Sequence, residues 1–193
     1  MSFVLASQSP FRLALLNQIG YTPSIVSPQN VDESVLPKEL PRAYVRRVMN
    51  MKVTEALQKF PGEIILGADT IVAVGRRIFQ KPETIEEAEH MLALFSGRRF
   101  KVITAVGIAQ KERRVEKIVP TTIVFKRLSA FEKAAYLKTN TWHHTSGGIA
   151  IEAIGGAFIK AIHGSASSVM GLPLYETKNL LESFGIYPEW MKG

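Results

Sequence analysis

The two aspartates of this chain, Asp32 and Asp69, are the only ones among its 193 residues. Each is expected where a strand ends, Asp32 beyond residues 24–27 and Asp69 directly after residues 64–68. A carboxylate just past a buried strand is oriented, partly desolvated and able to hold a hard cation. This placement indicates a metal-assisted reaction on a phosphate-bearing substrate. The alternative is that both aspartates only cap turns.

A second group of polar residues lies at the start of the first predicted helix. Residues 3–6 are expected to form a short buried strand, after which Ser9 can cap a helix that has Pro10 at its first position. The free N–H groups and the dipole of a helix N-terminus attract phosphate. Ser7 lies in the same turn, and Arg12 is close enough to fork onto phosphate oxygens. A capping role alone also accounts for these serines.

Two lysines complete the candidate set. Lys52 lies between apolar neighbours on a predicted helix, and Lys81 precedes Pro82 in a loop whose backbone is held extended. Either ammonium is a candidate partner for a phosphate-bearing substrate. A lone lysine between apolar residues is also typical of a surface position, where the stem covers apolar groups and the ammonium reaches water.

The elements that must position these residues alternate between strands and helices. Strands are expected at 3–6, 24–27, 64–68 with an extended continuation over 70–74, 100–109, 115–125 and 157–162. Helices are expected at 10–20, 41–59, 84–95, 129–138 and 171–184. Residues 100–109 and 115–125 form a predicted hairpin that interrupts the alternation. The pattern predicts an α/β fold with a mixed sheet, in one domain covering residues 1–193.

The composition of the chain limits the classes of molecule that it is expected to bind. The net charge of +7 and the pI of about 9.7 favour anionic partners, either nucleic acid or small phosphorylated molecules. No apolar run approaches the roughly 20 residues of a membrane span. The N-terminus lacks the pattern of a signal peptide, so we expect a cytoplasmic protein without a membrane partner. The absence of cysteine excludes disulfides and thiolate metal sites.

Six segments, in register along the chain, carry a resemblance to a known family. They are Leu-Ala-Ser-Gln-Ser-Pro-Phe-Arg at 5–12, Asp-Glu at 32–33, Gly-Ala-Asp-Thr at 67–70, Lys-Pro at 81–82, Leu-Phe-Ser-Gly at 94–97 and Gly-Leu-Pro-Leu at 171–174. Each one is a weak signal, whereas the ordered set is specific. The chain resembles the Maf family of nucleoside triphosphate pyrophosphatases, also known as septum formation inhibitors.

This resemblance implies hydrolysis of a nucleoside triphosphate between its α- and β-phosphates, which removes non-standard nucleotides and is linked to cell-division arrest. It also implies a mixed sheet flanked by helices, two lobes with a central cleft like those of inosine triphosphatases, a divalent cation (Mg²⁺ or Mn²⁺) and a homodimer. The positions that match the family's phosphate-binding residues are Ser7, Arg12, Lys52 and Lys81. Glu33 and Asp69 match its acidic, metal-binding positions, and Asp69 is the usual proton acceptor. These residue types suit the implied reaction, because cations neutralise the charge of the triphosphate and a carboxylate can activate the attacking water.

Three positions that the family uses to choose a base give a mixed signal. The branch acting on dTTP and UTP has Arg, Thr and Gln there, and the branch acting on 7-methyl-GTP has Trp, Gln and Glu. This chain has Phe11, Thr70 and Glu152. An aromatic face with a carboxylate suits a cationic methylated guanine, but Thr70 and the segment 172–177 favour the pyrimidine branch, which we expect.

A larger departure lies at residues 140–149. The family's Glu, Lys and Tyr are replaced by Thr141, Thr145 and Ile149. Loss of a cation and a carboxylate beside the cleft leaves open a nucleotide-binding regulatory module with reduced catalysis. A nucleic-acid binder is less favoured, because the basic pairs are not interleaved with aromatic residues. His143 and His144 are adjacent without a nearby third ligand, which favours a solvated loop over a metal site.

Overall fold

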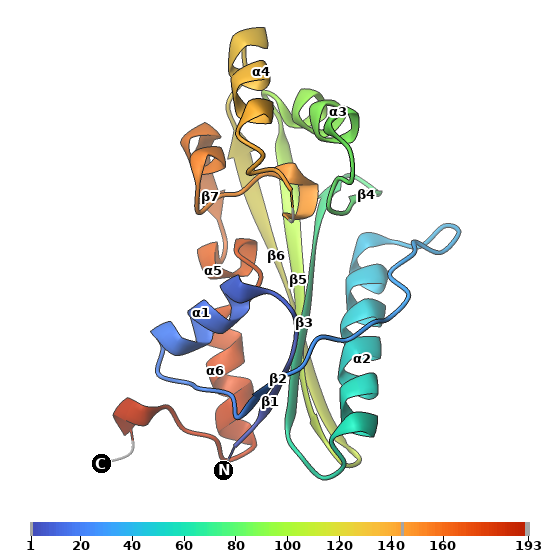
Figure 1. Cartoon of the computed structure of the whole chain (residues 1–193), viewed down its shortest axis with the longest axis vertical. Coiled ribbons are helices and arrows are strands. Elements are labelled where there is room, and N and C mark those ends of the chain that lie inside the picture. Colours follow the sequence, from blue (N-terminus) through green and yellow to red (C-terminus); the bar gives the residue numbers. More distant parts are fainter. Residues whose placement is uncertain (1, 144, 192–193) are drawn as a thin grey trace.

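The fold is a mixed α/β arrangement around one seven-stranded sheet (Figure 1). The structure is a computed structural model that describes residues 2–143 and 145–191. The strands are β1 (Val4–Ala6), β2 (Ile25–Val26), β3 (Ile65–Val74), β4 (Arg77–Phe79), β5 (Arg99–Gln110), β6 (Arg113–Phe125) and β7 (Ile159–His163). The α-helices are α1 (Pro10–Gln18), α2 (Pro41–Lys59), α3 (Ile85–Phe95), α4 (Ala130–Lys138), α5 (Ala166–Val169) and α6 (Leu174–Ser183). Three single-turn 3-10 helices are η1 (Ser146–Gly148), η2 (Ile154–Phe158) and η3 (Glu189–Met191). The predicted fold class is confirmed.

Strand order explains why the sheet is mixed. The order is β2-β1-β3-β5-β6-β7, and β4 pairs with β3. β1 lies parallel to both β2 and β3, whereas the pairs β3–β5, β5–β6 and β6–β7 are antiparallel. The predicted hairpin is present as the long strands β5 and β6, which run through most of the length of the molecule in Figure 1.

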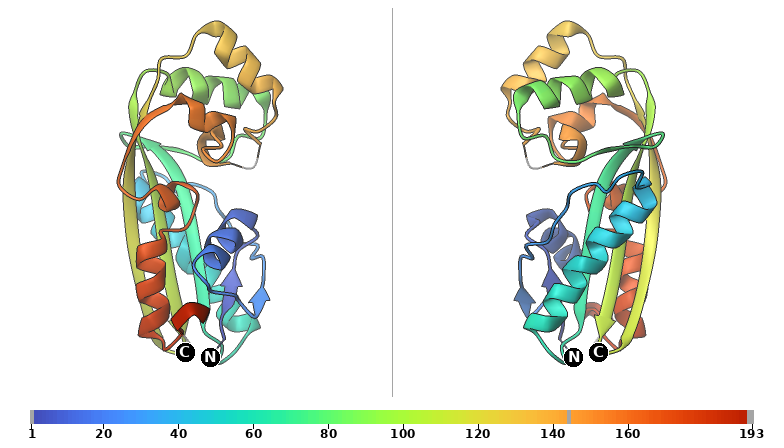
Figure 2. Two further views of the ribbon diagram at one scale, coloured as in Figure 1. Left: turned by 90° about the vertical axis from the view of Figure 1, so that its left-hand side faces the viewer. Right: turned by 90° about the vertical axis from the view of Figure 1, so that its right-hand side faces the viewer.

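Helices cover the sheet differently in the two halves of the molecule. Near the chain termini, α2 packs on one face, while α1 and α6 pack on the other. At the opposite end, α3 and α4 pack over a separate apolar cluster rich in phenylalanine. Figure 2 shows these halves as two lobes joined by the long strands. Within the described residues, no helix combines the length and the apolar character needed to cross a membrane.

The sequence of α2 places Lys52 against the sheet. Pro41 is suited to the first turn, and the buried positions recur every three or four residues, which makes one stripe. The buried residues after Pro41 are Tyr44, Val45, Val48, Met49, Lys52, Val53 and Ala56. Gly67 on β3 allows close approach, since a Cβ there would lie 2.6 Å from Val53 Cγ2. Lys52 is therefore not the surface lysine of the alternative interpretation, for it is only 9% exposed.

One expectation about the strands was wrong. Asp69 does not follow a strand, because β3 continues without interruption to Val74 and turns at Gly75 into β4. The hydrogen bonds with β5 continue through Asp69, which pairs with Ala105. Asp32 also lies away from a strand end, in a loop six positions after Val26.

Helix caps agree with the sequence in part. Ser129 and Glu132 form a reciprocal capping box at the start of α4. Thr84 caps α3 by accepting from the Glu87 N–H, but the Glu87 carboxylate accepts from the N–H of Glu83 instead. Ser9 lies at the N-cap of α1 without a capping side-chain hydrogen bond, so that prediction was wrong. The Ser9 N–H donates to Ser7 Oγ at 3.1 Å.

Candidate active site

A gap along one side of β3 creates the cleft. β1 pairs with β3 only as far as Gly67, where the chain turns away into α1, and β4 pairs with β3 only from Val72 onward. Asp69 and Thr70 lie between these two pairings. Neighbouring strand residues point to opposite faces, so one of these side chains faces α2 and the other faces the layer of α1 and α6. A cleft of about 270 Å³ opens at this gap.

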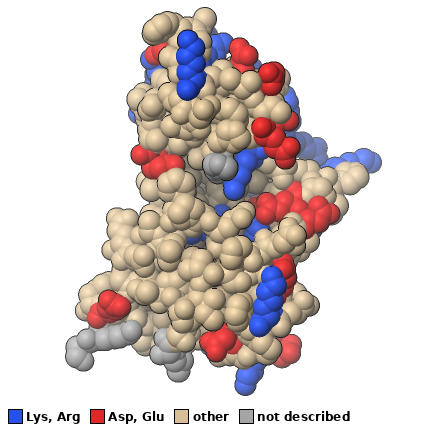
Figure 3. All heavy atoms as spheres, viewed as in Figure 1, with Lys and Arg blue, Asp and Glu red and all other residues tan. Residues whose placement is uncertain are grey.

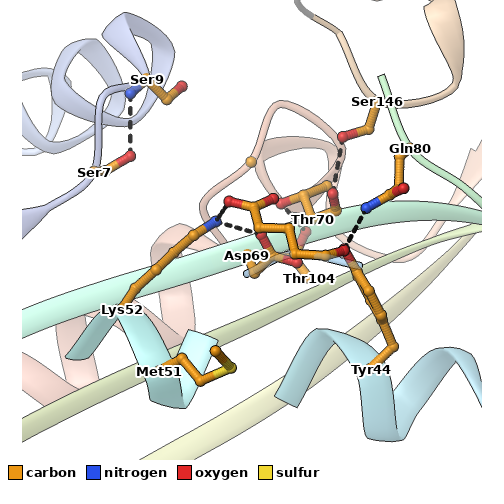
Figure 4. Close-up of polar contacts among 12 residues, drawn as sticks. Ser7, Ser9, Tyr44, Met51, Lys52, Asp69, Thr70, Gln80, Thr104 and Ser146 are labelled. Carbon is orange, nitrogen blue, oxygen red and sulfur yellow. Dashed lines mark hydrogen bonds and ion pairs between the residues drawn. The ribbon is translucent and has the colours of Figure 1, made fainter. Parts of the chain in front are cut away.

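An ammonium held by two carboxylates forms the centre of this cleft. Lys52 Nζ lies 2.7 Å from Asp69 Oδ1 and 2.8 Å from Glu33 Oε1. Figure 4 shows Lys52 reaching from α2 toward Asp69 on β3. Asp69 and Lys52 are buried, whereas the Glu33 side chain is 43% exposed. The fold thus brings together three residues that are distant in sequence, all predicted to be catalytic.

Burial makes the ionised form of Asp69 costly. Desolvation raises the pKa of this carboxyl above its ordinary value of 3.8, while the charges of Lys52 and Arg12 act in the opposite direction. Asp69 Oδ2 is buried and has no hydrogen-bond partner among the described residues. The carboxylate therefore depends on cations for its charge and retains an oxygen that can accept another contact.

The acidic pair suits a hard divalent cation. No cluster of three or more His, Cys, Asp or Glu that could hold a metal is present in the described part of the chain. Mg²⁺ does not need such a cluster, because it is usually bound by one or two carboxylates together with substrate phosphates and water. Asp69 Oδ2 and the partly exposed carboxylate of Glu33 fit this donor set. Glu33 and Asp69 thus keep their predicted assignment as metal ligands, which stays a prediction.

Two residues that the sequence did not indicate hold the Glu33 segment in place. The backbone carbonyl of Glu33 accepts from Tyr44 OH at 2.8 Å and from Gln80 Nε2 at 2.7 Å. Gln80 Nε2 also donates to Tyr44 OH at 2.6 Å. Asp32 shapes the same loop, since its Oδ1 accepts from the Ser34 N–H at 2.9 Å. Asp32 therefore has the turn-capping role that was the alternative for both aspartates.

Arg12 joins the two sides of the cleft. Its guanidinium donates to Ser7 Oγ at 3.1 Å, to Thr70 Oγ1 at 3.3 Å and to the carbonyl oxygen of Gly171 at 2.8 Å. Gly171 has a φ of +110° and lies close to Arg12, a conformation that favours glycine. Burial lowers the pKa of Arg12, while Asp69 and Glu33 raise it, and an arginine remains charged under these conditions. A fixed cation therefore lies beside the Ser7 hydroxyl.

Lys81 adds a second cation on the side of the cleft formed by β4. Desolvation by the surrounding protein lowers its pKa below the ordinary 10.5, and Arg12 lowers it further. Lys81, Arg12 and Lys52 all line the same cleft. Figure 3 shows the hollow between the lobes with Lys or Arg atoms inside it and Asp or Glu atoms beside it. The arrangement suits a polyanion that carries a divalent cation.

A smaller and mainly apolar cavity of about 100 Å³ adjoins the charged cleft. Thr70, Arg12 and Lys81 line both spaces, so the two are continuous. Phe11 and Glu152, two positions predicted to choose the base, line the apolar cavity. An uncharged planar group fits here better than in the cleft.

The altered segment also borders these cavities. Thr145 and Ile149 line the apolar cavity, and Thr141 lines an adjoining hollow. Ser146, which sequence reasoning missed, donates from Oγ to the carbonyl oxygen of Thr70 at 2.8 Å. The His143 ring stacks on Trp142, with centroids 4.3 Å apart, and His144 lies outside the described residues. The positions at 141–149 that depart from the family pattern therefore border the apolar cavity and the hollow next to it.

Comparisons with known proteins cover nearly the whole chain. The family model described as Maf-like protein matches residues 2–184. A dTTP/UTP pyrophosphatase of Caulobacter vibrioides is 44% identical over 188 residues, which cover 97% of each chain. A dTTP/UTP pyrophosphatase of Rhodopseudomonas palustris is 45% identical over 197 residues, covering 97% of this chain and 95% of the relative.

One solved structure aligns with part of the chain. The Ham1 protein of Staphylococcus aureus aligns with a TM-score of 0.46 and 14% identity, covering 65% of this chain and 71% of the other.

Proposed function

Since this chain belongs to the Maf family, we propose that it is a nucleoside triphosphate pyrophosphatase acting on dTTP and UTP. The products are the nucleoside monophosphate and pyrophosphate. The observation that carries the proposal is the ammonium of Lys52 held between Asp69 and Glu33, in a cleft that Arg12 and Lys81 also line. Three cations and two acids at a gap in the sheet match the charge of a metal-bound triphosphate.

The cationic side chains bind and orient the triphosphate. Arg12 is preorganised by its bonds to Ser7 Oγ and the Gly171 carbonyl, so little conformational entropy is lost when it contacts a phosphate oxygen. Lys81, which follows β4, lines the same cleft. Charge that develops on the departing pyrophosphate is stabilised by these groups without rearrangement of the site.

Asp69 is the proposed general base. Its carboxylate orients a water molecule and accepts a proton as the water oxygen attacks and the bridging P–O bond breaks. Lys52 partly offsets the effect of burial on this carboxylate and favours its ionised form through the 2.7 Å contact. A bound Mg²⁺ or Mn²⁺, held by Glu33, Asp69 and phosphate oxygens, would neutralise phosphate charge and favour deprotonation of the water.

Two observations support a preference for thymine and uracil, namely the position of Thr70 and the activity named for the relatives. Thr70 lies where the charged and apolar cavities meet, and the curated relatives are dTTP/UTP pyrophosphatases. Phe11 and Glu152 keep open the alternative of a 7-methyl-GTP enzyme, and the segment 141–149 keeps open a binding module with reduced turnover. A panel of nucleotides distinguishes these possibilities.

The test is incubation of the pure protein with Mg²⁺ and dTTP, UTP, CTP, GTP, ATP or 7-methyl-GTP, with monophosphate and pyrophosphate measured separately. We expect both products in equal amounts, and the fastest turnover with dTTP and UTP. Orthophosphate in place of pyrophosphate would mean stepwise removal of phosphates. Nucleotide binding without any product would identify the regulatory module.

We predict a bell-shaped pH dependence of kcat/KM. The acidic limb follows protonation of Asp69, whose pKa is raised by burial, so activity declines at a pH above the ordinary aspartate value of 3.8. The alkaline limb follows loss of charge on Lys81, whose pKa is lowered, so activity declines below 10.5. Lys81→Arg should move only the alkaline limb to higher pH, because arginine stays charged. An unchanged alkaline limb in that variant would exclude Lys81 as its origin.

Two further expectations from the sequence stay predictions. The homodimer can be tested by light scattering of the purified protein, and the cytoplasmic location by fractionation of cells.

A further inference from the structure

Thr104 lies directly behind Thr70 and contacts no solvent. The two residues are paired across the antiparallel strands β3 and β5, and their hydroxyl oxygens are 2.9 Å apart (Figure 4). Thr104 is 0% exposed, whereas Thr70 lines both the charged cleft and the apolar cavity. A polar side chain buried directly behind a cleft residue acts on a ligand only through that residue.

The hydrogen-bond partners define the direction of each hydroxyl proton. Thr104 Oγ1 lies 2.7 Å from the carbonyl oxygen of Ser168, which can only accept, so Thr104 donates there. Its single proton is thereby used, and the contact with Thr70 requires Thr70 to be the donor. Arg12, which has donors only, approaches Thr70 Oγ1 from its other side at 3.3 Å.

These hydrogen bonds leave the Thr70 hydroxyl with only one way of bonding to a ligand. A hydroxyl has one donor and two acceptor positions. The proton of Thr70 points inward to Thr104, one lone pair faces Arg12, and the remaining lone pair is free. Toward the cavities Thr70 therefore accepts a hydrogen bond and does not donate one.

We propose that Thr104 is a positioning residue that holds the Thr70 hydroxyl as an acceptor, so that the site favours nucleobases with a ring N–H. Uracil and thymine carry this donor at N3, whereas the N3 of cytosine is an acceptor and would face the lone pair of Thr70. This inference rests on the proposed function, because it assumes that the base occupies the apolar cavity next to Thr70. It assigns discrimination between UTP and CTP to a residue that never contacts the substrate.

The chain contains a matched control for a purely structural role. Thr121 on β6 is also 0% exposed, and its hydroxyl also bonds to the backbone at the start of α5, through the carbonyl and N–H of Ser165. Thr121 lines neither of the two cavities. Thr104→Val and Thr121→Val therefore each remove one buried hydroxyl that anchors α5, and only the first releases the proton of Thr70.

The experiment compares kcat/KM for UTP and CTP in wild type, Thr104→Val, Thr104→Ser and Thr121→Val. We expect Thr104→Val to lower the UTP:CTP ratio about tenfold, the factor that corresponds to roughly 1.4 kcal/mol and to one hydrogen bond. Thr104→Ser should keep the wild-type ratio, because it keeps the hydroxyl. An unchanged ratio in Thr104→Val, or an equal change in Thr121→Val, would overturn the proposal.

A binding measurement separates this proposal from the proposed function. The α,β-imido analogues of UTP and CTP cannot be hydrolysed between the α- and β-phosphates. Calorimetry with these analogues in the presence of Mg²⁺ therefore measures base preference in binding alone. A preference for the UTP analogue that is lost only in Thr104→Val supports the positioning role, even if no nucleotide is hydrolysed. Equal affinity of the wild type for both analogues contradicts it, even if hydrolysis occurs.

Discussion

Replacement of Asp69 by asparagine is expected to lower kcat by about 10²- to 10⁴-fold, the usual contribution of a general base. The amide keeps the size of the carboxylate but cannot take a proton from water, and it gives up the negative charge that Lys52 contacts at 2.7 Å. Because burial raises the pKa of Asp69, its ionised form is disfavoured in the folded protein. The variant should still fold, because the Lys52 ammonium keeps its second carboxylate partner, Glu33, at 2.8 Å. Steady-state kinetics with dTTP or UTP measure the loss.

Asp32→Asn is the matched control, since it changes the only other aspartate. Asp32 accepts the Ser34 N–H with one side-chain oxygen, which an asparagine can also do. It should retain wild-type kcat. The assignment of Asp69 as the base is wrong if Asp69→Asn keeps more than about a tenth of the wild-type kcat. Circular dichroism of both variants shows whether either substitution disturbs the fold.

The sequence indicated which residues gather at the cleft better than it predicted how they meet. Arg12, Asp69 and Lys81 all line the cleft. They could be predicted from the sequence because each belongs to an ordered motif next to a recognisable strand, helix start or proline. The bounds of α2 could also be predicted, from Pro41 and from the spacing of apolar residues up to Lys59. Such signals are local, so one sequence can carry them.

The remaining features depend on contacts between distant segments. The gap in the sheet exists because the pairing of β1 with β3 stops at Gly67 and the pairing of β4 with β3 reaches only to Val72. The strand β4 had not been predicted. Asp69 was expected after a strand because an acid usually ends an apolar run, but the strand passes through it at the gap. Neither Gln80 nor Thr104 carries a sequence signal of its own, although Gln80 directly precedes the Lys81-Pro82 motif. Both matter through partners at least 34 positions away.

Lys52→Met is expected to affect both stability and turnover. Lys52 is the close cationic partner of the buried Asp69 carboxylate, and removal of one member of a buried ion pair leaves an uncompensated charge. We expect a loss of about 3 kcal/mol in the free energy of unfolding near neutral pH, and a decrease in kcat/KM of at least roughly 100-fold. Urea denaturation and steady-state kinetics measure these two effects.

The loss of stability in Lys52→Met should depend on pH in a defined direction. Without Lys52, the already raised pKa of Asp69 rises further, because the ammonium was the largest influence that lowered it. A carboxyl with a raised folded-state pKa favours folding below its unfolded value near 3.8, and this contribution is lost as pH increases through the folded value. The deficit relative to wild type should therefore be largest at alkaline pH and shrink on acidification. A deficit independent of pH would show that lost packing, and not the charge of Asp69, causes it.

Two variants separate the charge of Lys52 from its position on α2. Lys59→Met removes an exposed lysine two turns further along the same helix, where the pair with Glu55 should contribute less than about 1 kcal/mol. The double variant Lys52→Met/Asp69→Asn removes both charges and should regain most of the stability lost in Lys52→Met, since no buried carboxylate is left without a partner. The double variant should remain inactive although its stability returns, because it lacks the proposed general base Asp69. If the double variant is as unstable as Lys52→Met, then the apolar stem of Lys52, and not its ion pair with Asp69, holds α2 against β3.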